Sequence, residues 1–322
     1  MDKKKLAFGI WLMTMALVAL SAFTIYFIAQ MRYSVLFCGY LTLVVLQLFA
    51  LTVFLVGDEN IKHVYIRIIY RLCCLSSLAV VPAFCFIFSA LTSQYHAKIK
   101  DTISVSYEEY EKILPQEDTT IYETDSLYII FPKYSKIDLV CEKRPKKSDK
   151  SITWCSGAAF QHDISLGFSH LNVEGYHACN GEYFDSPYIH DNSAGFASYD
   201  DNFKFEFENP ETVIKEAAAN GGSGFMQFGI IKDGEVIYSF SRTRSYRLLA
   251  ELNGNLCIID SKEMMNFEDF LSEVQKLHVT NALYMDMGAG WNYSWFRNQD
   301  NRVKTLFSLK VPWAHNWIVF RE

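Results

Sequence analysis

The sequence predicts an α+β protein in which an N-terminal region of three transmembrane helices precedes one exported domain of mixed α and β structure. Two observations predict this arrangement. Three long apolar runs fill the first third of the chain, whereas strand-length apolar runs alternate with capped helices from about residue 100 onward. We therefore expect a membrane region over residues 1–95 and an exported domain over residues 96–322.

Composition limits the class of protein. The chain has 322 residues and a hydrophobic content of 50%, which is high for a wholly soluble protein. Its formal net charge of −6 argues against a general nucleic-acid binder, because such proteins carry a basic face. A lipid bilayer is therefore an expected partner, and nucleic acid is not.

The first apolar run, residues 7–30, has no charged residue and is long enough to cross a hydrocarbon core as a helix. Residues 34–56 and about 72–92 form two more such runs, and the third contains Pro82, which a membrane helix tolerates. A cleaved signal peptide is the competing interpretation of the first run. The run is too long for one and two further spans follow it, so three transmembrane helices are expected.

Basic residues predict the orientation of these spans. Lys3, Lys4 and Lys5 precede the first span, and further basic residues lie in the amphipathic segment 57–71 between the second and third. Because basic flanks stay in the cytoplasm, the N-terminus is expected there. The C-terminal domain is then extracytoplasmic, either periplasmic or at the cell surface.

Eight cysteines are scattered along the chain without a CxxC pair or a spacing typical of a metal site. Four lie in the apolar N-terminal third, where a free thiol behaves as a small hydrophobic group. The other four could form disulfides in an exported domain, and the sequence leaves their pairing open. The first four are Cys38, Cys73, Cys74 and Cys85, and the others are Cys141, Cys155, Cys179 and Cys257.

Helices of the exported domain are predicted from their starting residues. Asn209-Pro210-Glu211 supplies a capping residue, a proline for the first turn and an acid near the positive end of the helix dipole, so a helix is expected to Asn220. A similar start at 266–269 predicts a helix to about residue 277, and a short helix is expected at 107–114.

Strands are predicted from short apolar runs that end at turn residues. Asp233-Gly234 and Asn253-Gly254 are hairpin signals. Segment 161–202 has no regular period and is expected to form one long functional loop or several short ones. Strands are expected at 126–131, 137–141, 152–160, 224–231, 235–241, 248–252, 256–259, 281–286, 304–309 and 318–320.

The strand at 281–286 ends in the most informative stretch of the chain. Asp286 follows an apolar run, and Gly288 and Gly290 come directly after it, where they would let a substrate approach the backbone. Aromatic residues follow, beginning with Trp291. A strand, a tight turn and an aromatic core plug would explain the same pattern without any function.

Polar candidates gather in other parts of the exported domain as well. Taken singly, each is a weak signal: a lone histidine is more often structural, and two arginines that alternate on a strand also suit a solvent-exposed edge. The candidates are the segment 157–160, then His170, Asn172, His177, Asn180 and Glu182, and finally Gln227, Arg242 and Arg244.

Two segments together resemble the phosphodiester glycosidase family: NPETVIKEAAANGGSGFMQFGIIKDGEVI and RTRSYRLLAELNGNLCIIDSKEMMNFEDFLSEVQKLHVTNALYMDMGAG. The resemblance covers roughly residues 120–320. Its lysosomal uncovering-enzyme type removes N-acetylglucosamine from mannose-6-phosphate diesters. The chain departs from the family where Asp-Gly-Gly-Gly-Ser is replaced by Asp286-Met287-Gly288-Ala289-Gly290, and where the Asn of Asn-Ala-x-Phe-Phe is Gly157. The resemblance therefore implies the fold of this family but not its sugar.

The resemblance implies a hydrolase for sugars linked through a phosphodiester. Asp286 would stabilise an oxocarbenium-like transition state as nucleophile, base or electrostatic partner. Arg242 and Arg244 would bind the phosphate oxygens of the leaving group, which guanidinium groups match in geometry. His170 or His177 would carry a proton to or from water.

The remaining candidates are expected to bind substrate. Neither a metal nor another cofactor is expected, because no ligand spacing demands one; a metal held by Asp286 with His170 or His177 is conceivable. The expected substrate-binding residues are Arg244, Gln227, Asn172, Asn180, Glu182, Gly288, Gly290 and Trp291.

Three functions are compatible with the sequence. The leading hypothesis is a membrane-anchored exported hydrolase of glycosyl-phosphate linkages, with a glycan or glycosyl-phosphate as substrate. The alternative is a carbohydrate-binding or envelope-assembly protein that keeps the fold without turnover, which the altered motifs at 157 and 287 favour. A transmembrane sensor is the weakest hypothesis, because the sequence shows no cytoplasmic output domain.

Overall fold

The computed structural model describes residues 94–96, 99, 101–162, 169–286, 293–309 and 316–322, all within one compact unit that covers residues 92–322. The expected membrane spans at 7–30, 34–56 and 72–92 and the amphipathic segment 57–71 lie outside the described residues. Among the residues that are described, no helix has the length and apolar character needed to cross a bilayer. The expected boundary between residues 95 and 96 stays a prediction.

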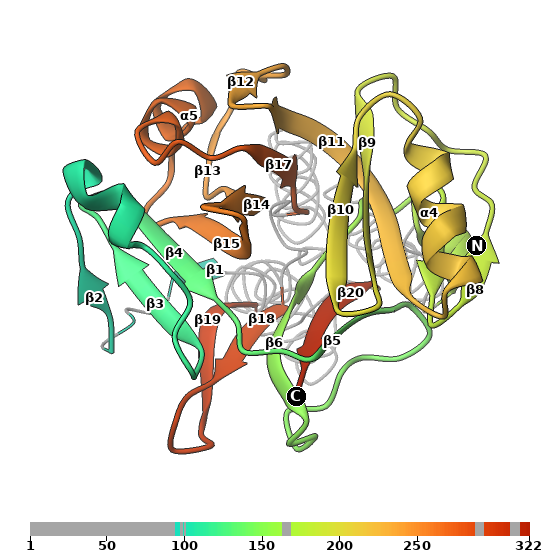
Figure 1. Cartoon of the computed structure of the whole chain (residues 1–322), viewed down its shortest axis with the longest axis horizontal. Helices are drawn as coiled ribbons and strands as arrows, with labels where there is room; N and C mark the ends of the chain where they lie inside the picture. The colour runs from blue at the N-terminus through green and yellow to red at the C-terminus, as the bar shows by residue number, and fades with distance from the viewer. Residues whose placement is uncertain (1–93, 97–98, 100, 163–168, 287–292, 310–315) are drawn as a thin grey trace, which may run out of the picture. The chain divides into compact units, whose positions relative to one another are not determined.

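The prediction of an α+β domain is wrong, because the described part of the chain is predominantly β (Figure 1). Its α-helices are α4, Pro210–Ala219, and α5, Phe267–Gln275, and its 3₁₀ turns include η1, Tyr107–Lys112, and η3, His170–Asn172. The difference comes largely from segment 161–202, where loops were expected. That segment contains β7, His177–Cys179, β8, Glu182–Phe184, β9, Ser193–Tyr199, and β10, Asn202–Glu206.

One sheet has the strand order β1-β19-β18-β6-β20-β5 among the described strands. Its central strands alternate between two apolar faces: Trp154 and Phe320 belong to the main core, whereas Cys155 and Val319 belong to a second cluster on the opposite face. The strands are β1, Gln94–His96, β5, Lys136–Val140, β6, Ile152–Gly157, β18, Tyr293–Arg297, β19, Val303–Leu309, and β20, Trp317–Arg321.

The larger sheet has the order β10-β9-β11-β17-β14-β15-β4-β3-β2 along its main path; β7 and β12 join it at β11, and β8 pairs with β7. Its middle strands are buried nearly throughout, which explains their continuous apolar runs. The remaining strands are β2, Ile103–Ser104, β3, Thr120–Glu123, β4, Leu127–Phe131, β11, Ser223–Lys232, β12, Glu235–Val236, β14, Arg247–Leu252, β15, Asn255–Ser261, and β17, Asn281–Tyr284.

The main core includes buried residues from both sheets, such as Ile129 and Trp154. Helix α4 packs on β9 and β11, and two glycines allow this close approach. A Cβ atom at Gly195 would lie 2.7 Å from Cγ1 of Val213, and one at Gly224 would lie 3.0 Å from Cδ1 of Ile214, both on α4. Both strands therefore need glycine where the helix crosses them.

The hairpin predicted at Asn253-Gly254 is confirmed. Both residues have positive φ angles, 50° and 73°, as a two-residue turn between twisted strands requires. Leu252 pairs with Asn255, and the same register carries back to Arg247 opposite Asp260. This register determines which polar groups meet inside the sheet.

Candidate functional site

Asp286 lies where the larger sheet meets the segment that follows β6. The backbone N–H of Met285 donates to the carbonyl of Arg247 on β14 (3.0 Å), and that of Asp286 donates to the carbonyl of Ala158 (3.0 Å). Consecutive residues thus bond to different partners, and Asp286 is 9% exposed. The carboxylate expected at a strand end is therefore placed at the junction between β17 and the end of β6.

Asn316, which the sequence did not single out, fixes the same segment from another side. Its amide oxygen accepts from the N–H of Ala159 (2.8 Å), and its amide nitrogen donates to the carbonyl of Ala159 (3.1 Å). A buried backbone position is thus satisfied by a side chain rather than by a strand partner. The segment 157–160 therefore lies beside Asp286, and Asn316 holds its backbone in place.

Aromatic rings surround Tyr284, two residues before Asp286. The ring centroid of Tyr284 lies 5.7 Å from the ring centroid of Phe160 and 5.3 Å from that of Phe240. Arg244 donates from Nη1 to the hydroxyl of Tyr284 (3.2 Å), and its guanidinium lies 5.8 Å from the ring of Phe240. Arg244 is half-buried, so one of the two predicted guanidinium groups reaches the end of β17.

Arg242 lies in a different environment. The short strand β13, Thr243–Arg244, pairs with β16, Met265–Asn266, and Arg242 precedes it with an exposed side chain. Its carbonyl accepts from the hydroxyl of Tyr246. The backbone of Arg242 therefore has a structural contact, and the catalytic role expected for its side chain remains a prediction.

Arg247 is an arginine that the sequence analysis passed over. Its Nε and Nη2 donate to the two carboxylate oxygens of Asp260, both at 2.5 Å. Its Nη1 donates to the hydroxyl of Ser156 (2.7 Å) and to that of Ser294. Because Arg247 and Asp260 are both fully buried, this pair ties the larger sheet to β6 and β18. The sequence contains a signal for this pair, because a hairpin turn at Asn253-Gly254 places Arg247 opposite Asp260.

Gln227 lies on β11 and is 2% exposed. Its amide oxygen accepts from the backbone N–H of Phe228 (2.8 Å), whereas its Nε2 has no hydrogen-bond partner among the described residues. Phe228 contacts Phe160, with ring centroids 5.1 Å apart. A buried amide without a partner is uncommon in proteins, so Gln227 is suited to bind a ligand oxygen.

The two predicted histidines lie side by side. His170 Nδ1 is 3.1 Å from His177 Nε2, and His177 Nδ1 is 3.2 Å from the carbonyl of Gly175. Since a carbonyl only accepts, His177 carries its proton on Nδ1 and offers a lone pair at Nε2. Burial lowers the pKa of His177 to about 4 and also lowers the pKa of His170, so both rings are neutral at neutral pH.

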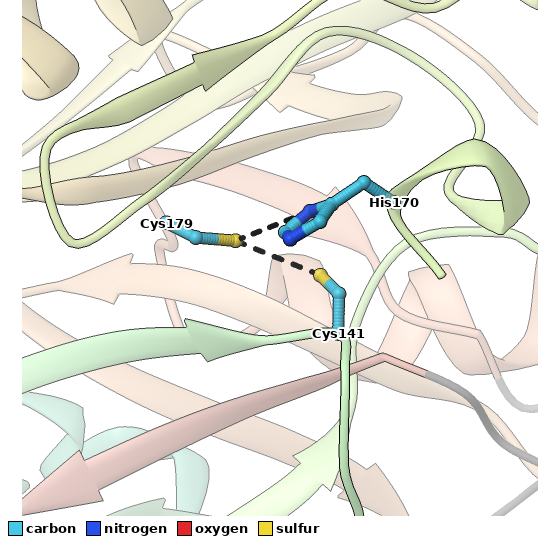
Figure 2. Close-up of side chains that lie close together, drawn as sticks. All are labelled: Cys141, His170 and Cys179. Atoms are coloured by element: carbon cyan, nitrogen blue, oxygen red, sulfur yellow. Dashed lines mark hydrogen bonds between the residues drawn. The ribbon is translucent and has the colours of Figure 1, made fainter. Parts of the chain in front are cut away.

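A cavity of about 300 Å³ opens beside His170. His170, Asn180 and Glu182 line it, whereas Asp286, Arg242 and Arg244 are not among its described lining residues. Cys141 and Cys179 also line it, and Figure 2 shows their sulfur atoms beside the His170 ring. The hydrogen bond with Cys179, followed by burial, raises the pKa of Cys141.

The predicted residues therefore fall into two groups. Asp286 and Arg244 lie around the end of β17, whereas His170, Asn180 and Glu182 surround the cavity. Asn172 is buried at the end of η3, where its carbonyl accepts from the N–H of His162 (3.1 Å). Gly288, Gly290 and Trp291 lie outside the described residues.

No family model matches the sequence, and no curated protein matches it. Among solved structures, a match is found to the catalytic domain of zebrafish N-acetylglucosamine-1-phosphodiester alpha-N-acetylglucosaminidase, auto-inhibited by its pro-peptide. It has a TM-score of 0.46 and 11% identity, and it covers 61% of this chain and 76% of that one. Membership of the phosphodiester glycosidase family remains a prediction, since a match at this level does not show it.

Proposed function

We propose that this domain is a hydrolase that cleaves a sugar from a phosphodiester, with Asp286 as its carboxylate and Arg244 as its phosphate-binding cation. The observation that carries the proposal is the hydrogen bond from Arg244 to Tyr284. It holds a half-buried guanidinium at the strand end that leads, two residues later, to Asp286. A carboxylate and a cation at one strand end suit a substrate that develops positive charge on the sugar and carries negative charge on the leaving group.

The chemistry divides between these two residues. Departure of the leaving group from the anomeric carbon gives the sugar ring oxocarbenium character, which the carboxylate of Asp286 stabilises. The leaving group is a phosphate ester and is already a stable anion, so it gains more from a bound cation than from a strong acid. The guanidinium of Arg244 supplies that cation and can bind two phosphate oxygens at once.

Neighbouring groups support a sugar ligand. Phe160 and Phe240 are half-buried, pack against the buried ring of Tyr284 and offer apolar surface for the face of a sugar ring. The buried Nε2 of Gln227, which has no hydrogen-bond partner among the described residues, would donate to a hydroxyl oxygen that reached it. A glycan of the cell envelope as substrate would place the domain outside the cytoplasm, and this location is part of the proposal.

Hydrolysis by the purified full-length chain tests the proposal. The chain is offered a panel of glycosyl phosphodiesters that differ in sugar and anomeric configuration, and release of free sugar is measured. We expect turnover of at least one compound and loss of about 1,000-fold or more in kcat for Asp286→Asn. Arg302→Gln, which alters an exposed arginine outside the proposed site, is the matched control and should leave turnover unchanged.

Two results would contradict the hydrolase. A folded chain that turns over no member of the panel would remove the proposal, and sugar binding without turnover would support the carbohydrate-binding alternative. An Asp286→Asn variant that is folded and fully active would remove Asp286 from the chemistry.

A further inference from the structure

Three side chains from separate parts of the chain meet beside the cavity. Cys141 directly follows β5 in the six-stranded sheet, Cys179 ends β7 in the larger sheet, and His170 begins η3. Their ligand atoms, two Sγ atoms and one imidazole nitrogen, all lie within 4.8 Å of one another (Figure 2). The proposed hydrolytic residues play no part in this cluster.

The distances fit the coordination of a tetrahedral metal ion. With Zn–S bonds of about 2.3 Å and Zn–N bonds of about 2.0 Å, zinc would separate two sulfurs by about 3.8 Å, a sulfur and a nitrogen by about 3.5 Å, and two nitrogens by about 3.3 Å. The Sγ atoms of Cys141 and Cys179 are 3.6 Å apart, and Cys179 Sγ is 3.9 Å from His170 Nδ1. His170 Nδ1 and His177 Nε2 are 3.1 Å apart.

The setting of His177 agrees with the same interpretation. Histidines near bound metals commonly donate their second N–H to a backbone carbonyl, which fixes the ring and the tautomer. His177 does this to the carbonyl of Gly175 and directs the Nε2 lone pair toward His170 Nδ1. His177 Nε2 therefore lies beside the ligand nitrogen of His170, but it is outside the group of three ligand atoms and would have to move to become a fourth ligand.

A cation can also reach the cluster. Cys141, His170 and Cys179 line the cavity, so the ligand atoms adjoin open space. Glu142 lies at the same cavity, with its carboxylate 3.7 Å from His170 Nε2, and its side chain is mostly exposed. An exposed carboxylate beside the ligands attracts cations to them.

We propose that Cys141, His170 and Cys179 bind one zinc ion that cross-links the two sheets. On binding, each thiol releases its proton to solvent, and the proton with which His170 Nδ1 otherwise donates to His177 Nε2 is released while Nε2 of His170 takes one up, so the ring stays neutral. The ion then takes two thiolates and the Nδ1 lone pair of His170, and the two negative charges neutralise the metal. A disulfide between the cysteines would explain the two sulfurs but not the imidazole directed at them. The proposal gives His170 a structural role in place of proton transfer.

Cobalt serves as a spectroscopic probe for the test. The full-length chain is reduced without oxygen, freed of metal with a chelator and titrated with Co²⁺. We expect one equivalent to give thiolate-to-cobalt absorption and the intense visible bands of a tetrahedral site, and Zn²⁺ to displace it. Cys141→Ala and Cys179→Ala should each weaken binding by about 100-fold or more, and His177→Gln by about 10-fold. The matched controls Cys155→Ala and Cys257→Ala alter other buried free cysteines and should bind as the parent does.

Alkylation of the parent chain avoids any dependence on how the variants fold. Bound zinc should slow the reaction of Cys141 and Cys179 with a thiol reagent, measured peptide by peptide by mass spectrometry. A reduced, folded chain that binds neither Co²⁺ nor Zn²⁺ would overturn the proposal. Unchanged binding in Cys141→Ala and Cys179→Ala would overturn it too, as would a Cys141–Cys179 disulfide in a chain that binds no zinc after reduction.

Discussion

Arg244 and Arg247 are three residues apart in sequence, yet the two lie in opposite environments. Arg247 is 0% exposed and directs its N–H groups at Asp260, Ser156 and Ser294. Arg244 is half-buried, lies over Phe240 and donates to Tyr284. A buried guanidinium with four hydrogen bonds to side chains inside the protein stabilises the fold. A half-buried guanidinium that donates to a single hydroxyl among the described residues can still receive a ligand. The difference separates a structural arginine from a candidate binding arginine.

We expect the largest loss of stability when the buried Arg247 is replaced. Arg247→Met leaves the carboxylate of Asp260 buried without its cation, and we expect the free energy of unfolding to fall by about 3–5 kcal/mol. Denaturant unfolding of the domain measures this change. The double variant Arg247→Met with Asp260→Leu should recover part of the loss, since it removes both charges. A single variant that costs under about 1 kcal/mol would show that the pair is not the tie we describe.

Replacement of Arg244 should affect hydrolysis much more than stability. Arg244→Gln removes the cation but leaves a half-exposed polar side chain, so we expect the free energy of unfolding to change by less than about 0.5 kcal/mol. Hydrolysis of a glycosyl phosphodiester should fall by about 100-fold in kcat/KM. If Arg244→Gln lost as much stability as Arg247→Met, Arg244 would be a structural arginine like Arg247, and the distinction between the two would be wrong.

Removal of the Tyr284 hydroxyl should decrease kcat/KM by less than replacement of Arg244 does. Tyr284→Phe keeps the ring and its aromatic contacts but removes the hydroxyl that accepts from Arg244. Loss of one hydrogen bond of about 1 kcal/mol predicts a decrease of about 5-fold in kcat/KM. The same substitution in an Arg244→Gln background should have no further effect on kcat/KM. An additive decrease would mean that Tyr284 acts independently of Arg244.

The smallest effect belongs to Arg242. Its side chain is exposed, and its hydrogen bond with Tyr246 is accepted by its backbone carbonyl, which any residue supplies. Arg242→Gln should therefore leave unfolding within about 0.5 kcal/mol of the parent. We expect kcat/KM to fall by about 3-fold or less, through weaker attraction of an anionic substrate at low salt. A fall as large as that of Arg244→Gln would restore the paired role that the sequence suggested.

Local signals in the sequence predicted the elements that depend on them. The turn at Asn253-Gly254, the proline at the start of α4 and the apolar runs of β14 and β15 all have their causes within a few residues. Asn209 and Asn266 begin the predicted helices, although neither makes a side-chain capping bond. Such elements form where expected because propensity and packing agree.

Other elements could not be predicted from local signals. Strand β7 has only 3 residues, and β9 is rich in small residues. Both form because they pair with β11, which comes later in the chain. Cys141, His170 and Cys179 have no motif spacing, since the packing of the two sheets and of η3 brings them together. Arg247 was predictable in principle: a turn at Asn253-Gly254 places it opposite Asp260, and two opposite charges in apolar strands indicate a buried pair.

The proposed function depends on recognition of phosphate by Arg244 next to a carboxylate that acts on the sugar. It is tested most directly by the ratio of kcat/KM for a glycosyl phosphodiester to that for a neutral glycoside of the same sugar, measured in the parent chain and in Arg244→Gln. We expect a strong preference for the diester in the parent and a decrease of about 100-fold in this ratio in the variant. A ratio that is unchanged by the substitution, in a folded and active variant, would contradict it.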